Sequence, residues 1–129
     1  MRTKLILLIF LIVAFGYSQE VKKITSKKCM PKKGYYIKIK EVLEDSRCPQ
    51  GVTCVWAGQA IVAVEVYENK KLIEEKTLYF DGKHTAENIK WFSKYNDNKN
   101  IKQIQFLPAP KDGVKIKLKK RYINLVFEN

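Results

Sequence analysis

Apolar and polar residues alternate in short runs along most of this chain, and turn-forming residues separate the runs. Alternation with a period of two is typical of β-strands that bury one face, and tight turns between runs favour antiparallel neighbours. The alternating runs are residues 35–43, 60–67, 72–80, 101–107, 114–118 and 122–127. Residues 84–100 fit either a short helix or a strand. The sequence therefore predicts an all-β fold of six to eight short strands, either an antiparallel β-sandwich or a small β-barrel.

The segment between the first two runs holds a dense cluster of turn formers. Asp45 and Ser46 end the first run, because short polar side chains bond to nearby backbone groups and compete with strand pairing. Pro49 lacks an N–H and cannot lie inside a central strand, and Gly51 tolerates a positive φ. Gly58 indicates a bulge or a close backbone approach where the next strand begins. We therefore predict a structured loop between two strands.

The chain has three cysteines, so they cannot all pair within one molecule. The sequence alone allows Cys48–Cys54, Cys29–Cys48 or Cys29–Cys54. The first pairing is favoured, because the five residues between Cys48 and Cys54 contain the proline and the glycine of the turn. Cys29 would then be a free thiol or would link two copies into a dimer. Trp56 follows the expected bridge by two residues, and we predict that its ring packs over the sulfurs as a structural cap.

The same loop carries a sequence motif. It resembles a signature found in small secreted and lipid-anchored bacterial proteins of similar length, a family without an assigned activity. The resemblance implies export and carries no enzymatic function. The residues that match are Asp45-Ser46-Arg47-Cys48-Pro49, then Gly51-Val52, then Cys54-Val55-Trp56-Ala57-Gly58-Gln59-Ala60.

Residues 1–18 have the features of a secretory signal peptide. Arg2 and Lys4 supply the positive start, residues 5–15 are apolar, and small residues precede a predicted cleavage before Gln19. The apolar run is shorter than the ~20 residues that span a bilayer, and no cysteine follows it directly to receive a lipid. We therefore expect an exported protein, periplasmic or extracellular, without a transmembrane segment in its mature form.

After the signal peptide, residues 19–33 are predicted to be a polar leader and residues 34–129 a single β-sandwich domain. The net charge of the whole chain is +12, and it remains strongly positive once the signal peptide has been removed. Such an excess attracts anionic envelope polymers, membrane surfaces or nucleic acid.

Most lysines, however, occupy alternate positions of the strand patterns. We interpret these lysines as the solvated face of a sheet rather than as a dedicated anion site. The chain lacks the signatures of nucleic-acid binding, and the expected export argues against such a partner. The alternating lysines are Lys38, Lys40, Lys115, Lys117 and Lys119.

No catalytic residue, metal ligand or cofactor site is predicted. His84 is the only histidine and lies after a turn, without a nucleophile motif near it. Glu44 and Asp45 could act as acid and base, but two adjacent carboxylates close to Arg47 are more typical of a paired turn. A copper site formed by Cys29, the neighbouring methionine and His84 would have soft ligands but no recognised spacing.

Three functional hypotheses follow. The first is a secreted, non-enzymatic β-sandwich that binds a protein or an anionic envelope polymer through its loops. The second is an inhibitor-like module that presents the disulfide loop, since a rigid loop loses less conformational entropy on binding. The third is a redox or metal-binding protein that uses Cys29.

Overall fold

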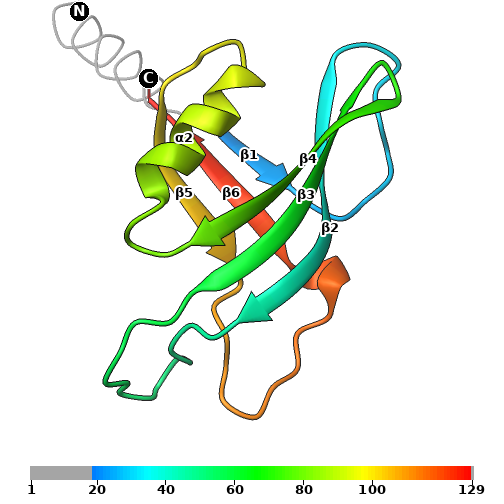
Figure 1. The fold of residues 1–129 in the computed structure, drawn as a ribbon. Coiled ribbons are helices and arrows are strands. Elements are labelled where there is room, and N and C mark those ends of the chain that lie inside the picture. The colour runs from blue at the N-terminus through cyan, green and yellow to red at the C-terminus, as the bar shows by residue number, and fades with distance from the viewer. Residues whose placement is uncertain (1–18, 129) are drawn as a thin grey trace, which may run out of the picture.

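The computed structural model describes residues 19–128, which form six strands, one α-helix and one short 3-10 helix. The strands form two three-stranded antiparallel sheets, in the orders β1-β6-β5 and β2-β3-β4 (Figure 1). The predicted all-β sandwich is therefore confirmed, with six strands. The predicted signal peptide, residues 1–18, lies outside the described residues. The strand bounds are β1 Val21–Ile24, β2 Tyr35–Asp45, β3 Ala60–Glu68, β4 Lys71–Phe80, β5 Ile101–Leu107 and β6 Tyr122–Phe127.

Strand β3 is the central strand of its sheet, as both of its neighbours pair with it along nearly its whole length. The alternate residues of β3 that point inward are fully buried, as the alternation predicted: Ala60, Val62, Val64 and Val66. They pack against the inner face of the other sheet, including Ile123 and Leu125 of β6. The core of the molecule lies between the two sheets.

Strand β1 lies inside the segment that the sequence predicted to be a polar leader. It pairs with β6 from Val21 to Ile24, and the Ile24 side chain belongs to the core. Only two of the four residues of β1 are apolar, so the alternation was too short to be recognised. The domain therefore begins with β1, and the boundary predicted at residue 34 is wrong.

Helix α2, Thr85–Lys94, occupies the segment that fitted either a helix or a strand. It contacts both β4 and β5 and lies over β5 in Figure 1. The buried Asn88 amide donates a hydrogen bond to the Tyr79 carbonyl oxygen of β4, at 2.9 Å. The Glu74 carboxylate accepts hydrogen bonds from Trp91 and Tyr95. These contacts attach the helix to the edge of the second sheet. Among residues 19–128, no helix is long and apolar enough to cross a membrane.

The strand predicted for residues 114–118 is not formed. Residues 112–117 belong to no strand or helix, and η1, Leu118–Lys120, is a 3-10 helix. Strand β6, which follows directly, already pairs with β1 on one side and β5 on the other. The segment therefore cannot pair with β6, the strand that follows it, and alternation alone did not create a strand. Lys115, Lys117 and Lys119 thus do not lie on the solvated face of a sheet, contrary to our interpretation.

Candidate functional site

The candidate site is the loop of residues 46–59, which we call the disulfide loop. It connects β2 to β3, whose last and first residues, Asp45 and Ala60, are paired across the sheet. Hairpin connections usually have two to five residues, and much longer ones are commonly functional. In Figure 1 the disulfide loop and the segment after β5 project from the same end of the molecule.

Hydrogen bonds between Ser46 and Gln59 hold the two ends of the disulfide loop together. The Ser46 N–H donates to the Gln59 carbonyl oxygen at 2.8 Å, and the Ser46 hydroxyl bonds to both backbone groups of Gln59. At Gly58, a Cβ atom would lie 1.7 Å from the Ser46 carbonyl oxygen. The chain therefore needs a glycine here, which confirms the predicted close backbone approach.

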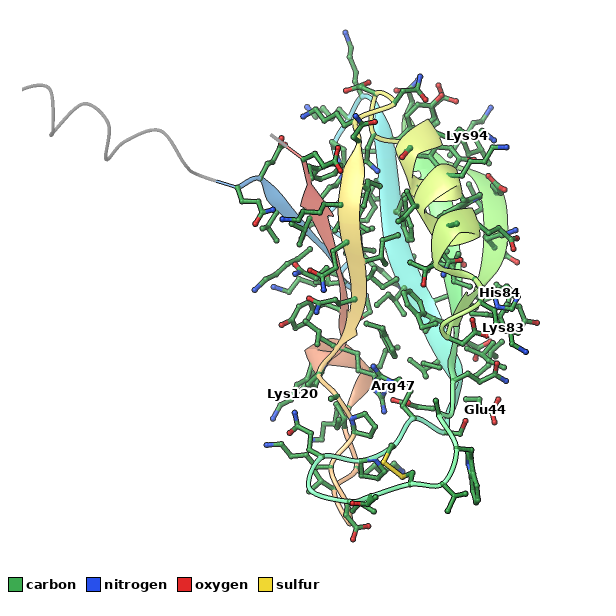
Figure 2. All side chains as sticks on the ribbon, turned by 90° about the vertical axis from the view of Figure 1, so that its left-hand side faces the viewer. Glu44, Arg47, Lys83, His84, Lys94 and Lys120 are labelled. Carbon is green, nitrogen blue, oxygen red and sulfur yellow. A yellow bond between two sulfur atoms is a disulfide. The ribbon has the colours of Figure 1, made fainter. Side chains whose placement is uncertain are left out.

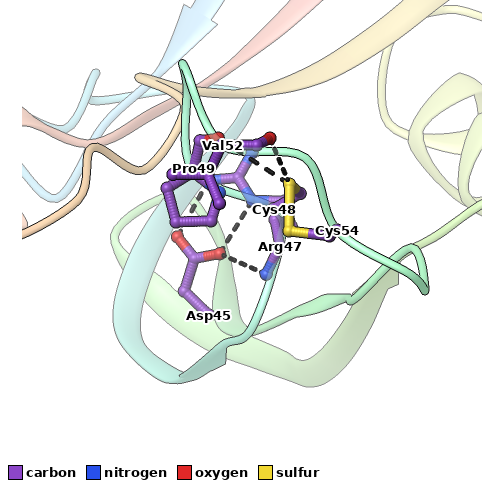
Figure 3. Close-up of a disulfide and its surroundings, with 6 residues drawn as sticks. All are labelled: Asp45, Arg47, Cys48, Pro49, Val52 and Cys54. Atoms are coloured by element: carbon purple, nitrogen blue, oxygen red, sulfur yellow. Dashed lines mark hydrogen bonds and ion pairs between the residues drawn. A yellow bond between two sulfur atoms is a disulfide. The ribbon is translucent and has the colours of Figure 1, made fainter.

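Two arginines and one carboxylate form a polar cluster at the base of the disulfide loop. Arg47 binds both oxygens of Asp45, at 2.8 and 2.9 Å, and Arg121 binds one of them at 2.8 Å. The Arg47 guanidinium also donates to the carbonyl oxygens of Phe106 and Pro108. Figure 2 places Arg47 at the end of the molecule that holds the disulfide loop, and Figure 3 shows it beside Asp45 and the disulfide. The cluster therefore joins the disulfide loop to β5, to the segment after it, and to the residue before β6.

The Asp45 side chain is only 8% exposed. Burial alone would raise the pKa of its carboxyl group, but the hydrogen bonds from Arg47 and Arg121 outweigh burial and lower that pKa. Asp45 is thus an ionised structural group with all its charge compensated. Asp45 therefore agrees with the expected paired turn, whereas Glu44 is exposed and accepts a hydrogen bond from the Gln59 side chain at 3.4 Å instead of binding an arginine.

Cys48 and Cys54 form a disulfide with a Cα–Cα distance of 5.9 Å, as predicted (Figure 3). The turn inside it uses Pro49, whose carbonyl oxygen accepts from the Val52 N–H, and Gly51, whose φ is +79°. An intramolecular disulfide indicates a non-reducing compartment. Cys29, in the segment between β1 and β2, is exposed and belongs to no disulfide within the described chain.

Trp56 does not cap the disulfide, so that prediction is wrong. Its side chain is 74% exposed, and the adjacent Val55 is 96% exposed. Val52, inside the disulfide, is also exposed at 44%. The spacing of Trp56 from Cys54 placed it near the bridge but could not show which side of the loop it occupies. The loop is therefore braced at its base and apolar at its surface.

A hollow of about 510 Å³ adjoins the returning limb of the disulfide loop. Its lining comes from both ends of the disulfide loop and from the turn between β4 and α2: Ser46, Ala57, Gly58, Gln59, Asp81, Gly82 and Lys83. The carboxylate of Asp81 is occupied, because it accepts hydrogen bonds from the ring and backbone nitrogens of His84. The hydrogen bond from the His84 ring lowers the pKa of Asp81.

His84 is held by Asp81, and within residues 19–128 no three His, Cys, Asp or Glu side chains lie close enough together to hold a metal ion. Arg121 is a site residue that sequence analysis missed, because 76 positions separate it from Asp45 and no local pattern links them. Comparisons with protein-family models, with curated proteins and with solved structures found no match to this chain.

Proposed function

We propose that this protein is a non-enzymatic binding module that presents the disulfide loop to a protein partner, with Trp56 as the main anchor. One observation carries the proposal: Trp56 and Val55 are the most exposed large apolar side chains of the described residues, and both lie on a braced loop. An exposed tryptophan beside exposed aliphatic side chains is unfavourable in water and is typical of interaction sites.

The brace makes the loop suitable for this role. The disulfide, the Ser46–Gln59 hydrogen bonds and the Asp45–Arg47–Arg121 cluster fix the base of the loop before a partner arrives. A preformed loop loses little conformational entropy on binding, so more of the contact energy appears as affinity. The arrangement favours the inhibitor-like hypothesis, in which the loop inserts its apolar residues into a cleft of the partner.

Export is part of the proposal. The signal-peptide features of residues 1–18, the resemblance to secreted and lipid-anchored bacterial proteins, and the disulfide support it together. N-terminal sequencing of the protein from envelope and medium fractions tests this part, and a mature chain beginning near Gln19 is expected. An exported pool that retains Met1 would contradict it.

The binding role is tested by placing a photoreactive amino acid at position 55 and, as a matched control, at Leu72. Leu72 is also an exposed apolar residue, 49% exposed, but it lies in β4 next to the β3–β4 hairpin turn, at the other end of that sheet. We expect a discrete crosslinked protein from position 55 alone, and its loss when Trp56→Ala is added. Equal crosslinking from both positions, or insensitivity to Trp56→Ala, would refute the proposal.

A further inference from the structure

A second surface, at the end of the molecule that holds the disulfide loop, is formed by one short stretch rich in positive charge. Residues 111–121, here called the basic segment, contain six basic residues and one acidic residue, Asp112. The backbone N–H of Gln50 donates to the Pro110 carbonyl oxygen, and Gln50 forms a bridge with Lys111, so the segment is attached to the disulfide loop. The basic residues are Lys111, Lys115, Lys117, Lys119, Lys120 and Arg121.

The charges of this segment are largely uncompensated. Arg121 is occupied by Asp45, but the five lysines are exposed and form no ion pair with any residue of 19–128. Two lysines of β2 are compensated by contrast: Lys38 pairs with Glu65 and Lys40 pairs with Glu75. The lysines of the basic segment are therefore available to an external anion.

The usual structural reason for such lysines does not apply here. Lysines at alternate positions commonly form the solvated face of a strand, but residues 112–117 form no strand. Ile116 and Leu118 instead line a cleft of about 510 Å³ together with Val42 and Leu43 of β2, and none of the lysines lines it. The rest of the lining is charged and consists of Glu41, Glu44, Asp45 and Arg121. Ile116 is thus half-buried against the body of the molecule, whereas the five lysines are exposed.

The spacing of the lysines suits a linear ligand. The backbone is extended at Lys117, with φ −70° and ψ 146°. These angles are those of a polyproline II backbone, which rises about 3 Å per residue and distributes its side chains around the axis. Lys115, Lys117, Lys119 and Lys120 therefore place four positive charges close together along the chain, and Figure 2 shows Lys120 at the end of the molecule that holds Arg47.

We propose that the basic segment binds a linear anionic polymer that carries a carboxylate, sulfate or phosphate group on successive repeats. The proposal goes beyond the protein-binding role of the disulfide loop and does not rest on it. A polymer fits better than an anionic bilayer, because the exposed side chains of the segment are mainly lysines, whereas its exposed apolar residues are two, Val114 at 57% and Leu118 at 36%. Binding to a polyanion releases counterions, so its affinity falls as salt rises.

The test compares two variants of equal net charge. In the first, Lys115, Lys117, Lys119 and Lys120 are changed to Gln. In the matched control, Lys27, Lys28, Lys32 and Lys33 are changed to Gln; these lysines are also exposed. The control segment ends at Gly34, whose N–H binds Asn69 at the β3–β4 turn, at the opposite end of the sheet from the disulfide loop (Figure 1).

Binding is measured by titration calorimetry with dextran sulfate and with polygalacturonate, at several salt concentrations. We expect the first variant to lose at least about 10-fold in affinity near physiological salt and to show a shallower salt dependence. The control should change less than about 3-fold. Circular dichroism checks the fold, which should persist because the substituted side chains are exposed and unpaired.

Three outcomes would overturn the proposal. Equal losses in both variants would show that overall charge, and not the basic segment, attracts the polymer. Binding to phosphatidylglycerol vesicles without binding to either polymer would assign the segment to a membrane surface. Loss of polymer binding in Trp56→Ala would show that the polymer occupies the disulfide loop, whereas unchanged binding in that variant would support two separate sites.

Discussion

Two neighbouring loops at one end of this protein are held in opposite ways. The disulfide loop is fixed by a covalent bond, by hydrogen bonds between its ends and by a buried ionic cluster, and it exposes apolar side chains. The basic segment has few such constraints and exposes lysines. Apolar contacts act over short distances and need a defined surface, whereas charges attract over about 10 Å at moderate salt and tolerate an irregular backbone. The difference in bracing therefore matches the difference in the proposed ligands.

The comparison predicts that the base of the disulfide loop is the more sensitive region, and Gly58→Ala should have the largest effect. The new methyl group would lie 1.7 Å from the Ser46 carbonyl oxygen, and two backbone segments would have to separate. We expect a loss of at least about 3 kcal/mol in the free energy of unfolding, measured by urea denaturation. Gly82→Ala is the control, because nothing lies within 4 Å of its added Cβ. Similar stabilities for the two variants would contradict a rigid loop base.

Asp45→Asn should have the second-largest effect on the free energy of unfolding, because it leaves Arg47 and Arg121 close together without their shared carboxylate. We expect a loss of about 2 to 3 kcal/mol at pH 7. Since the pKa of Asp45 is lowered in the folded protein, its contribution is complete above about pH 4 and is lost as the pH falls through the folded pKa.

The pH dependence distinguishes this cluster from an ordinary surface pair. Hydrogen bonds from Tyr67 and His84, respectively, also lower the pKa values of Glu65 and Asp81, so some acid sensitivity will remain in any variant. Stability curves from pH 7 to pH 2 should nevertheless be flatter for Asp45→Asn than for the wild type. Parallel curves would show that the Asp45 carboxylate does not hold the loop base.

Removing the disulfide should have a smaller effect. Changing both Cys48 and Cys54 to Ala should reduce the free energy of unfolding by about 2 kcal/mol, because the bond closes a short loop. Cys29→Ala should change it little, as Cys29 is exposed and lies outside the disulfide. Peptide mapping without reduction provides an independent check, and a peptide that links Cys29 to either partner would contradict the assignment.

At the end of the molecule that holds the disulfide loop, the features that depend on neighbouring residues could be predicted from the sequence. The disulfide, the close approach at Gly58 and the pairing of Asp45 with Arg47 all involve residues close together in the chain or a turn with a clear chemical signature. The central strand β3 was predicted for the same reason, since its apolar alternation is long. These features follow from local stereochemistry and need no knowledge of the tertiary fold.

Three features that sequence analysis got wrong or missed depend on distant partners. Alternation in residues 114–118 predicted a strand, but no edge of the β1-β6-β5 sheet remained available beside β6. Strand β1 was missed because its pairing with β6, about 100 residues later, provides what its short pattern lacks. Arg121 contacts Asp45 only because the fold brings these two residues together. In each case the missing information was which segments the two sheets bring together.

The smallest effect on stability is expected for Trp56→Ala. A tryptophan that packed over the disulfide would lose several kcal/mol on truncation, as core aromatic residues do. Because the Trp56 side chain is 74% exposed, we expect a change of less than about 0.5 kcal/mol in the free energy of unfolding. Binding to the partner crosslinked from position 55 should instead weaken by about 30-fold, which corresponds to the ~2 kcal/mol of an interface anchor. Surface plasmon resonance with that partner and urea denaturation of the same sample measure the two quantities together. A large loss of stability would return Trp56 to a structural role and remove the contrast between a braced base and an exposed binding surface.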